Sequence, residues 1–511
     1  MKRTLTSAFL SVASGNLFVL LAALFTTPII VRLLGEHSYG QYATVMALFG
    51  LLMILVSSGV NSGTRKYISE DRDEEQWKSH VFGFYFRLAA LFAFLGSAAL
   101  LAAAQIGIVD RTLGEEFARY VYLLALLVFT SQFGEYTRRT LMGLQLEHIS
   151  EPINVLYKLS FAVFAILLAY LGYGVVGVLL GHVLARLLVI VTSMYFITKH
   201  VSVSAILTTT PEWFPREKLL NFNHLSVLYV FLLSSLYHVD VLMLEMYTTS
   251  AQVGYYKIAL VIAEFLWFVP RAVQSVMIQS TSDLWAQGKT ERVTEISTNV
   301  TRFTFVFTVL LAIGLAVLAE DFVPLYAGPA YTASVVPLLL LLPGAVGFAI
   351  ARPVLAISHA KGDLRVMIYA TGLSAGMNVV LNATLIPLYG IEGAAIATSI
   401  GYGSLPVFHV LGARRLGYRP LSDLRIVPVA VTATVTGLCI YPLAAAIDGV
   451  LLSLLVVPPV GFVVYSIVTV LTGAVTRTEV FDVLSDLPPP ISRRAATVER
   501  MLDEREFPFP R

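Results

Sequence analysis

The chain has 511 residues, of which 57% are hydrophobic and 13% are charged, and its formal net charge is +2. The charged fraction is about half that of an average soluble domain, and the mean hydropathy is +0.77, so most of the chain is expected to lie in lipid. A net charge this small does not favour nucleic acid as a partner. The single cysteine, Cys439, cannot form an intrachain disulfide.

Two basic residues precede the first apolar segment, as they do in a signal peptide. However, Thr4, Ser7, Ser11 and Ser14 recur at spacings of three and four, which places a polar stripe on one face of a helix. A signal peptide would be uniformly apolar here, so we expect a spanning helix that is retained. The stripe either lines a water-filled cavity, which makes Ser7, Ser11 and Ser14 candidate cavity residues, or forms a seam between helices.

Segments of about 20 apolar residues, long enough to cross a bilayer, recur along the whole chain. In the first half they are expected at residues 10–31, 42–60, 81–108, 120–141, 153–171 and 175–197. In the second half they are expected at 222–247, 253–278, 300–318, 332–358, 366–386 and 391–411. Two more, 426–447 and 449–471, follow. The sequence therefore predicts an all-α polytopic membrane protein with about 14 transmembrane helices.

Short motifs repeat in order at an offset of 214 to 216 residues. The matches are Gly40-Gln41-Tyr42 with Gly254-Tyr255-Tyr256, Arg138 with Arg352, and 173–177 with 389–393. We therefore expect two six-helix lobes, 1–215 and 216–424, then two additional helices in 425–473 and a tail in 474–511. Because each lobe has an even number of spans, the repeat is predicted to be parallel, with its axis along the membrane normal.

Lysine and arginine gather in alternate connections between the spans, which indicates the cytoplasmic side. This pattern predicts a multi-pass protein of the cell (plasma) membrane with both termini in the cytoplasm.

Ionisable side chains inside spans point to function, because each costs about 2.5 to 3.5 kcal/mol at a helix centre. Five basic residues fall in the cytoplasmic halves of their spans: Arg87, Lys158, Arg186, Arg271 and Arg352. Together they would form a cationic vestibule for a phosphate or pyrophosphate, whose oxygens suit arginine forks. Arg87 and Lys158 lie close enough to the loops to snorkel to the lipid head groups instead. The other three lie deeper and favour the cavity.

Other motifs do not indicate catalysis. Gly288-Lys289-Thr290 resembles the end of a phosphate-binding loop, but Asp283 stands where the first glycine belongs. The histidines lack metal-ligand spacing, and no nucleophile lies beside a base. We therefore expect no enzyme activity, no metal site and no cofactor.

Three segments carry a family resemblance: 34–43, 240–259 and 386–398. They are similar to helix junctions of polysaccharide transporters in the multidrug/oligosaccharidyl-lipid/polysaccharide (MOP) exporter superfamily, the O-antigen flippase (Wzx-like) group. The resemblance covers roughly residues 1 to 425, and the two trailing helices agree with the fourteen-helix members. These motifs specify the superfamily well and the cargo poorly.

The resemblance implies a flippase that moves a polyprenyl-(pyro)phosphate-linked sugar from the cytoplasmic to the outer leaflet by alternating access. The cargo would be undecaprenyl-linked for a surface polysaccharide, or dolichol-phosphate-linked for protein glycosylation. Its lipid tail would stay among membrane lipids along the extra helices, and glycosyltransferases or an oligosaccharyltransferase or polymerase of the same pathway are implied partners. If an ion gradient drives transport, Asp240 and Glu264 are the candidate coupling residues.

Two other functions stay open. A cation-coupled drug antiporter of the same superfamily would use buried carboxylates, whereas deep cations outnumber deep carboxylates here. A membrane-embedded glycosyltransferase would need a large outer catalytic loop, and the outer connections are short.

Overall fold

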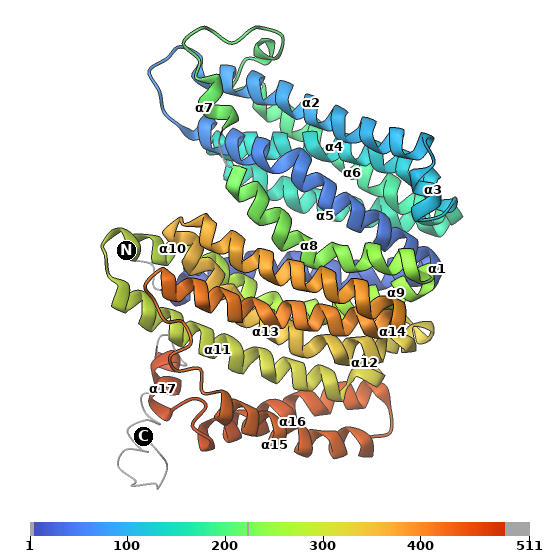
Figure 1. The fold of residues 1–511 in the computed structure, drawn as a ribbon, viewed down its shortest axis with the longest axis vertical. Coiled ribbons are helices and arrows are strands. Elements are labelled where there is room, and N and C mark those ends of the chain that lie inside the picture. Colours follow the sequence, from blue (N-terminus) through green and yellow to red (C-terminus); the bar gives the residue numbers. More distant parts are fainter. Residues whose placement is uncertain (1–4, 222–223, 486–511) are drawn as a thin grey trace. The chain divides into compact units, whose positions relative to one another are not determined.

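The structure is a computed structural model that describes residues 5–221 and 224–485 (Figure 1), and the described chain is mostly helical, with helices joined by turns and short loops. The helices are α1 Leu5–Ser69, α2 Trp77–Gln105, α3 Ile108–Thr112, α4 Glu116–Gly143, α5 Glu147–Leu168, α6 Gly174–Ile197, α7 Arg216–Leu220, α8 His224–Tyr247, α9 Ser250–Ala263, α10 Phe268–Ala286, α11 Thr290–Val317, α12 Ala319–Ala327, α13 Val335–Lys361, α14 Leu364–Arg415, α15 Ile426–Ala446, α16 Val450–Leu471 and α17 Arg477–Ser485. Four shorter segments join them: a π-helix, η1 Ala169–Tyr173, and three 3₁₀ helices, η2 Val203–Ile206, η3 Glu264–Trp267 and η4 Pro329–Ser334. The all-α prediction is confirmed.

Eleven helical segments of the described chain are long and apolar enough to cross a membrane. Three of these segments are interrupted within the helical run: Leu24–Ser57 at Gly35, Glu147–Ile197 at Gly172 and Leu364–Arg415 at Gly390. A straight helix of 52 residues would be about 78 Å long, more than twice the hydrocarbon thickness. Each interrupted segment therefore supplies two spans, which agrees with the predicted number of about 14.

At two of these interruptions one glycine has the same backbone conformation. Gly174 has φ 53° and ψ −134°, and Gly390 has φ 56° and ψ −127°. A side chain is strongly disfavoured at such a positive φ, so glycine is needed at both positions. The two glycines are equivalent in the sequence repeat, so the repeat extends to the backbone turn that separates two consecutive spans.

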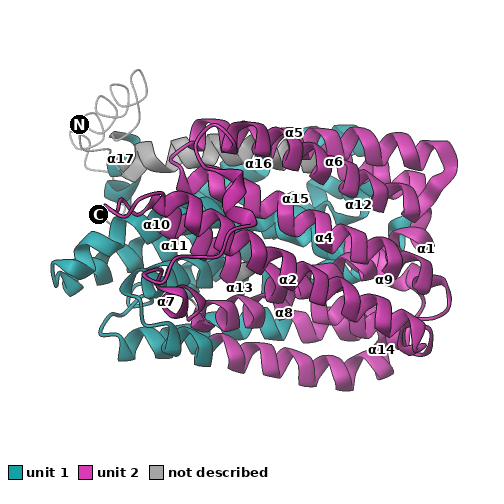
Figure 2. Ribbon diagram, turned by 90° about the horizontal axis from the view of Figure 1, so that it is seen from above, with its two compact units in different colours: residues 1–18, 259–370, 399–511 teal, residues 19–258, 371–398 magenta. Residues whose placement is uncertain are grey.

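The chain divides into two compact units (Figure 2). Unit 2 comprises residues 19–258 and 371–398. In it, α6 packs on α4 and α5, and α2 packs on α4. The interior contains aromatic side chains, among them Phe82, Tyr85 and Tyr136, that pack at ring distances of 5 to 7 Å.

Unit 1 comprises residues 1–18, 259–370 and 399–511. Here α13 packs on α10 and α11, while α15 and α16 pack on each other and on α11. At its centre the buried indole of Trp267 donates to the Ala345 carbonyl (2.8 Å) and packs edge-on against Phe348. The expected lobes 1–215 and 216–424, with 425–473 and 474–511 following them, stay a prediction.

Candidate functional site

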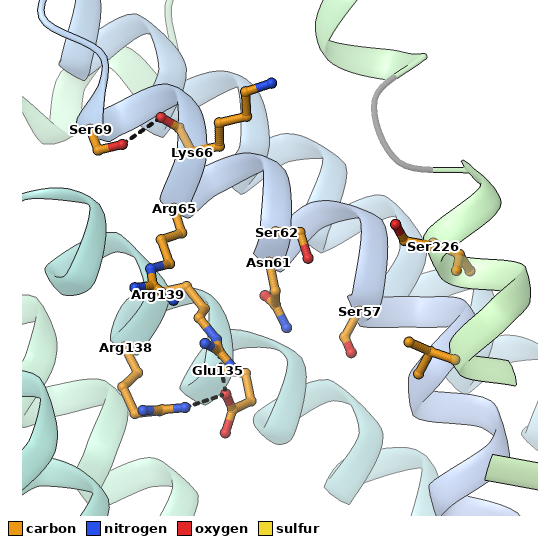
Figure 3. Close-up of a pocket in the computed structure, with 12 residues that line it drawn as sticks. Ser57, Asn61, Ser62, Arg65, Lys66, Ser69, Glu135, Arg138, Arg139 and Ser226 are labelled. Atoms are coloured by element: carbon orange, nitrogen blue, oxygen red, sulfur yellow. Dashed lines mark hydrogen bonds and ion pairs between the residues drawn. The ribbon is translucent and has the colours of Figure 1, made fainter. Parts of the chain in front are cut away.

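A cavity of about 720 Å³ in unit 2 has a strongly charged lining (Figure 3). Its walls come from the last turns of α1, the C-terminal half of α4 and the first turns of α8. Its charged lining consists of four basic side chains and one carboxylate: Arg65, Lys66, Arg138, Arg139 and Glu135. Small polar side chains complete the lining: Ser57, Asn61, Ser62, Ser69 and Ser226.

Glu135 is the centre of this charged group. Its carboxylate lies 3.3 Å from Arg138 Nη2 and 3.8 Å from Arg139 Nε, and it accepts a hydrogen bond from Arg186 Nη1 at 3.1 Å. Arg138 Nη1 also lies 3.7 Å from the carboxylate of Glu151, so two carboxylates offset only part of the positive charge of three arginines. The side chains of Arg138 and Arg186 are 12% and 13% exposed, so solvent screens this charge only weakly.

Two polar atoms of the lining residues have no hydrogen-bond partner among the described residues. Nε of Arg138 and Oδ1 of Asn61 are buried and make no hydrogen bond to any described residue. Guanidinium groups with spare N–H donors match the oxygens of phosphate or carboxylate. By charge and donor set, the cavity can hold a phosphate or pyrophosphate group.

Of the five predicted basic residues, Arg186 and Lys158 lie next to this cavity. The Arg186 guanidinium reaches Glu135 and also covers the ring of Tyr157, at 3.9 Å from its centroid. The Lys158 Nζ lies 5.6 Å from the same ring centroid. Neither residue lines the cavity itself, but Arg186 contacts its lining through Glu135.

Arg87 lies elsewhere in unit 2 and holds a loop. Its Nη1 donates to the backbone carbonyls of Ala205, Ile206 and Thr208 at 3.1, 3.0 and 2.6 Å. These bonds fix the segment around η2 against α2, which accounts for Arg87 without a ligand.

Arg271, Arg352 and Glu264 meet around Trp267 in unit 1. The guanidinium carbon of Arg271 lies 5.5 Å from the centroid of the Trp267 ring, and that of Arg352 lies 5.0 Å from it. The Glu264 carboxylate accepts a hydrogen bond from Arg271 Nη2 at 3.0 Å. Arg352 donates to Oε1 of Gln274 at 2.9 Å. Glu264 lies in η3, a 3₁₀ turn that interrupts a spanning helix, and such turns often mark hinges.

Asp240 is fully buried on α8 in unit 2 and belongs to a polar cluster. Its Oδ2 accepts hydrogen bonds from Tyr256 Oη at 2.5 Å and from Thr398 Oγ1 at 3.1 Å. Asn378 donates to Thr398 Oγ1 at 3.4 Å, and Asn382 donates to Asn378 Oδ1 at 3.1 Å. Oδ1 of Asn382 is buried and accepts no hydrogen bond from the described residues. The cluster is therefore rich in oxygen ligands around a single carboxylate.

An apolar groove of about 520 Å³ lies in unit 1, between α11, α12, α15 and α16. Its lining is almost entirely aliphatic or aromatic, and includes Leu310, Leu318, Phe322, Leu454 and Phe462. The two helices that follow the sequence repeat, α15 and α16, supply one of its walls.

The sequence analysis did not identify the cavity residues on α1 and α4 as a binding site. The sequence pattern places Arg65, Lys66, Arg138 and Arg139 in cytoplasmic connections, and Arg138 also in the repeat. A signal was present, because Ser57, Asn61, Ser62 and Arg65 recur at helical spacing and place a polar face at the end of a span.

Ser7, Ser11 and Ser14 belong to α1, but their side chains lie outside the described part of the structure. Within 5–221 and 224–485, no group of three or more His, Cys, Asp or Glu side chains could hold a metal ion.

Comparisons with known proteins agree with this architecture. The probable low-salt glycan biosynthesis flippase Agl15 of Haloferax volcanii is 22% identical over 389 residues, which cover 74% of this chain and 77% of that protein. The lipid II flippase MurJ, in an inward closed conformation, has a similar fold, with a TM-score of 0.74 at 16% identity over 90% of this chain and 98% of that one. An inward-facing multidrug resistance MATE family transporter of the MOP superfamily has a TM-score of 0.67 at 17% identity, over 77% of this chain and 94% of that one.

The predicted resemblance to the superfamily is thereby confirmed, as is the multi-pass membrane architecture. The sequence model of one family, described as "Polysaccharide biosynthesis protein", matches residues 29–336, which is more than half of the chain. The chain belongs to the polysaccharide biosynthesis protein family.

Proposed function

We propose that this protein is a transporter, a flippase that carries a polyprenyl-(pyro)phosphate-linked sugar from the cytoplasmic to the outer leaflet of the cell membrane. The observation that carries the proposal is the cavity around Glu135, which four basic side chains and one carboxylate line at the ends of spanning helices. Relatives and structural neighbours that are named as flippases support it.

The cavity suits the head group of such a cargo. Its volume of about 720 Å³ lies within the range of ordinary ligand sites, roughly 300 to 1,000 Å³. The phosphate oxygens would accept from Arg65, Arg138 and Arg139, and the serine and asparagine side chains would hydrogen-bond to the first sugar. The basic side chains would thus bind the charged phosphate, and the neutral polar side chains would bind the uncharged sugar.

The apolar groove suits the other end of the cargo. A polyprenyl tail gains about 0.8 kcal/mol for each methylene that it keeps out of water. The groove beside α15 and α16 is lined mainly by aliphatic side chains. It would keep the tail in an apolar environment during transport.

The cluster around Asp240 is the proposed site for a coupling cation. A buried carboxylate, two amide oxygens and a hydroxyl are ligands that a small hard cation such as Na⁺ prefers. Secondary transporters place such ions within their spanning helices. Glu264 is a weaker candidate, because its carboxylate already pairs with Arg271.

The same cluster favours one alternative function, a cation-coupled antiporter of drugs or other small molecules. A structural neighbour is a multidrug resistance transporter, and a buried carboxylate is what exchange against a cation requires. The cavity argues for the flippase, because cationic drugs would be repelled from its four basic side chains.

The deciding experiment is mass spectrometry of lipid extracts and surface glycans from a strain that lacks the protein. We expect a polyprenyl-linked sugar to accumulate and the surface glycan to be lost, and the accumulated lipid identifies the cargo and its carrier. Unchanged lipid-linked sugars with an intact glycan, in a strain with increased drug sensitivity, would favour the antiporter. Glycosyltransferases of the same pathway would supply the cargo, and a polymerase or oligosaccharyltransferase would consume it.

A further inference from the structure

A buried histidine in unit 2 is held between two phenols. His182 on α6 has its Nε2 at 2.9 Å from Tyr42 Oη and its Nδ1 at 3.0 Å from Tyr157 Oη. The imidazole is stacked on the ring of Phe161, with 3.8 Å between the centroids, and only 7% of the residue is exposed. The transport steps proposed above make no use of this group.

A short series of contacts connects this histidine to the cationic cavity. The ring of Tyr157 is covered by the guanidinium of Arg186 at 3.9 Å. Arg186 in turn pairs with Glu135, which lines the cavity, at 3.1 Å. Three contacts therefore lead from the imidazole to the carboxylate in the cavity wall.

The surroundings of His182 can accommodate either protonation state. A neutral imidazole needs one donor and one acceptor, and a phenol hydroxyl can be either. An imidazolium donates twice, and the oxygens of Tyr42 and Tyr157 can both accept, while the face of Phe161 attracts the positive charge. No hydrogen-bond partner needs to be replaced when the proton is gained or lost.

The charges around His182 decide which state it adopts. Lys158 on α5 and Arg186 on α6 are the positive groups near His182, and the negative Glu135 on α4 pairs with Arg186. The direct contacts from α1 and α5 are the neutral Tyr42, Tyr157 and Phe161. The excess of positive charge and the burial both oppose an imidazolium. An anion in the cavity would offset the arginines and remove part of that opposition.

We propose that His182 takes up a proton when an anionic head group occupies the cavity, and releases it when the head group leaves. This inference rests on the proposed function, because it needs the cavity to bind an anion. One N–H bond forms with a proton from solvent, and the same bond breaks on release. Coupling of this kind is reciprocal, so a bound proton must also increase the affinity for the anion. A proton that travels with the cargo would reduce the negative charge moved across the membrane potential.

The test is isothermal titration calorimetry of the purified full-length protein with inorganic pyrophosphate at pH 6, in buffers of different ionisation enthalpy. The slope against that enthalpy gives the number of protons taken up with each anion. We expect wild-type protein to take up more protons than His182→Asn, by up to about one proton per pyrophosphate. Protons released by pyrophosphate itself are common to both proteins and cancel in the difference. The wild-type affinity should also fall more steeply between pH 6 and pH 8 than that of the variant.

Matched variants separate this inference from its alternatives. Tyr136→Phe removes another buried phenol in the same unit, one that donates to the Phe82 carbonyl at 2.6 Å, and should keep the wild-type proton number. Tyr157→Phe breaks the connection to Arg186 and should lower that number, which provides a second measurement if His182→Asn does not fold. Equal proton numbers in wild type, His182→Asn and Tyr157→Phe overturn the inference. So does a proton uptake that is lost in Glu135→Gln but retained in His182→Asn, since Glu135 would then be the group that titrates. A complete absence of pyrophosphate binding instead contradicts the proposed head-group site, and this inference with it.

Discussion

Gly40 and Gly254 meet at a backbone contact that has no room for a side chain on either residue. A Cβ on Gly40 would lie 1.6 Å from the Ser250 carbonyl oxygen, and a Cβ on Gly254 would lie 2.3 Å from the Glu36 carbonyl oxygen. Glu36 and Ser250 are themselves 214 residues apart, so the contact is symmetric under the sequence repeat. The two equivalent helices touch here at the closest distance that the backbone allows.

The first prediction concerns this contact. Gly40→Ala should force α1 and α9 apart, because the obstacle is a backbone carbonyl that cannot rotate away. We expect a lower thermal unfolding temperature of the purified protein and loss of transport in cells. Gly376→Ala is the matched control, since a Cβ there meets no atom within 4 Å and alanine in a helix gains about 0.5 to 1 kcal/mol over glycine. A Gly40→Ala protein with normal stability and normal transport would show that the contact is dispensable.

The second prediction concerns the cationic cavity. Arg138→Ala and Arg139→Ala should each reduce transport by about 10- to 100-fold, because a hydrogen bond to a charged group contributes about 1.5 to 3 kcal/mol. The measurement is accumulation of the lipid-linked sugar in cells that depend on the variant, at equal protein level. Arg292→Ala is the control, because its ion pair with Glu295 lies on an exposed surface.

The third prediction concerns the deeper arginines. Arg186→Ala, Arg271→Ala and Arg352→Ala should abolish transport without loss of protein from the membrane. Arg186 shapes the cavity through Glu135, whereas Arg271 and Arg352 pack on Trp267 in the other unit. Normal transport in all three variants would exclude the vestibule that the sequence predicts.

The fourth prediction concerns Asp240. Asp240→Asn removes the only carboxylate of its cluster among the described residues but keeps the size of the side chain. Transport into proteoliposomes should therefore lose its dependence on a Na⁺ gradient. Asp448→Asn, at an exposed position between α15 and α16, should behave as wild type. If the wild-type protein ignores Na⁺ but follows a proton gradient through Asp240, the coupling cation is H⁺ and the Na⁺ assignment is wrong.

The fifth prediction concerns α17. Arg302, which is 1% exposed, pairs with Asp423 and with Glu479 on α17. Burial raises the pKa of Glu479, but the hydrogen bonds from Thr476 and the charges of Arg302 and Arg425 outweigh burial and hold that pKa below its usual range. The stabilisation is therefore complete above the unfolded-state pKa of about 4.3 and is lost as the pH falls through the lower folded-state value.

Glu479→Gln should accordingly lower the free energy of unfolding by about 1 to 3 kcal/mol at neutral pH, and by less in acid. Glu295→Gln, in the exposed pair with Arg292, should change it by less than about 1 kcal/mol. Thermal unfolding followed at several pH values measures both. A Glu479→Gln effect that does not change with pH would contradict the ionic explanation.

The fold was predictable because span length and Lys/Arg placement are local properties of the sequence. The break at Gly390 was also visible, since its motif repeats the one at Gly174. The cavity was not, because its charge comes from residues near the ends of α1 and α4, where sequence alone cannot distinguish a loop cation from a cavity wall. The packing of α4 against α6 brings Glu135 to Arg186, residues that are 51 positions apart.

For Arg87, the sequence indicated a candidate ligand-binding residue but not the partners that the structure shows. A basic residue inside a span suggested a ligand, but its partners are three backbone carbonyls of a loop more than 100 residues away. Carbonyl groups carry no sequence signature, so no pattern could have identified them.

Arg138 and Arg352 are equivalent in the repeat, yet one lines a polar cavity and the other packs on the ring of Trp267. A chain with two copies of every turn needs only one copy of each binding site. The second copy of a position is then free to acquire another task, such as supporting the fold. The two positions are thus equivalent in the sequence repeat but differ in their surroundings, since one contributes charge to a cavity and the other packs within the interior of unit 1.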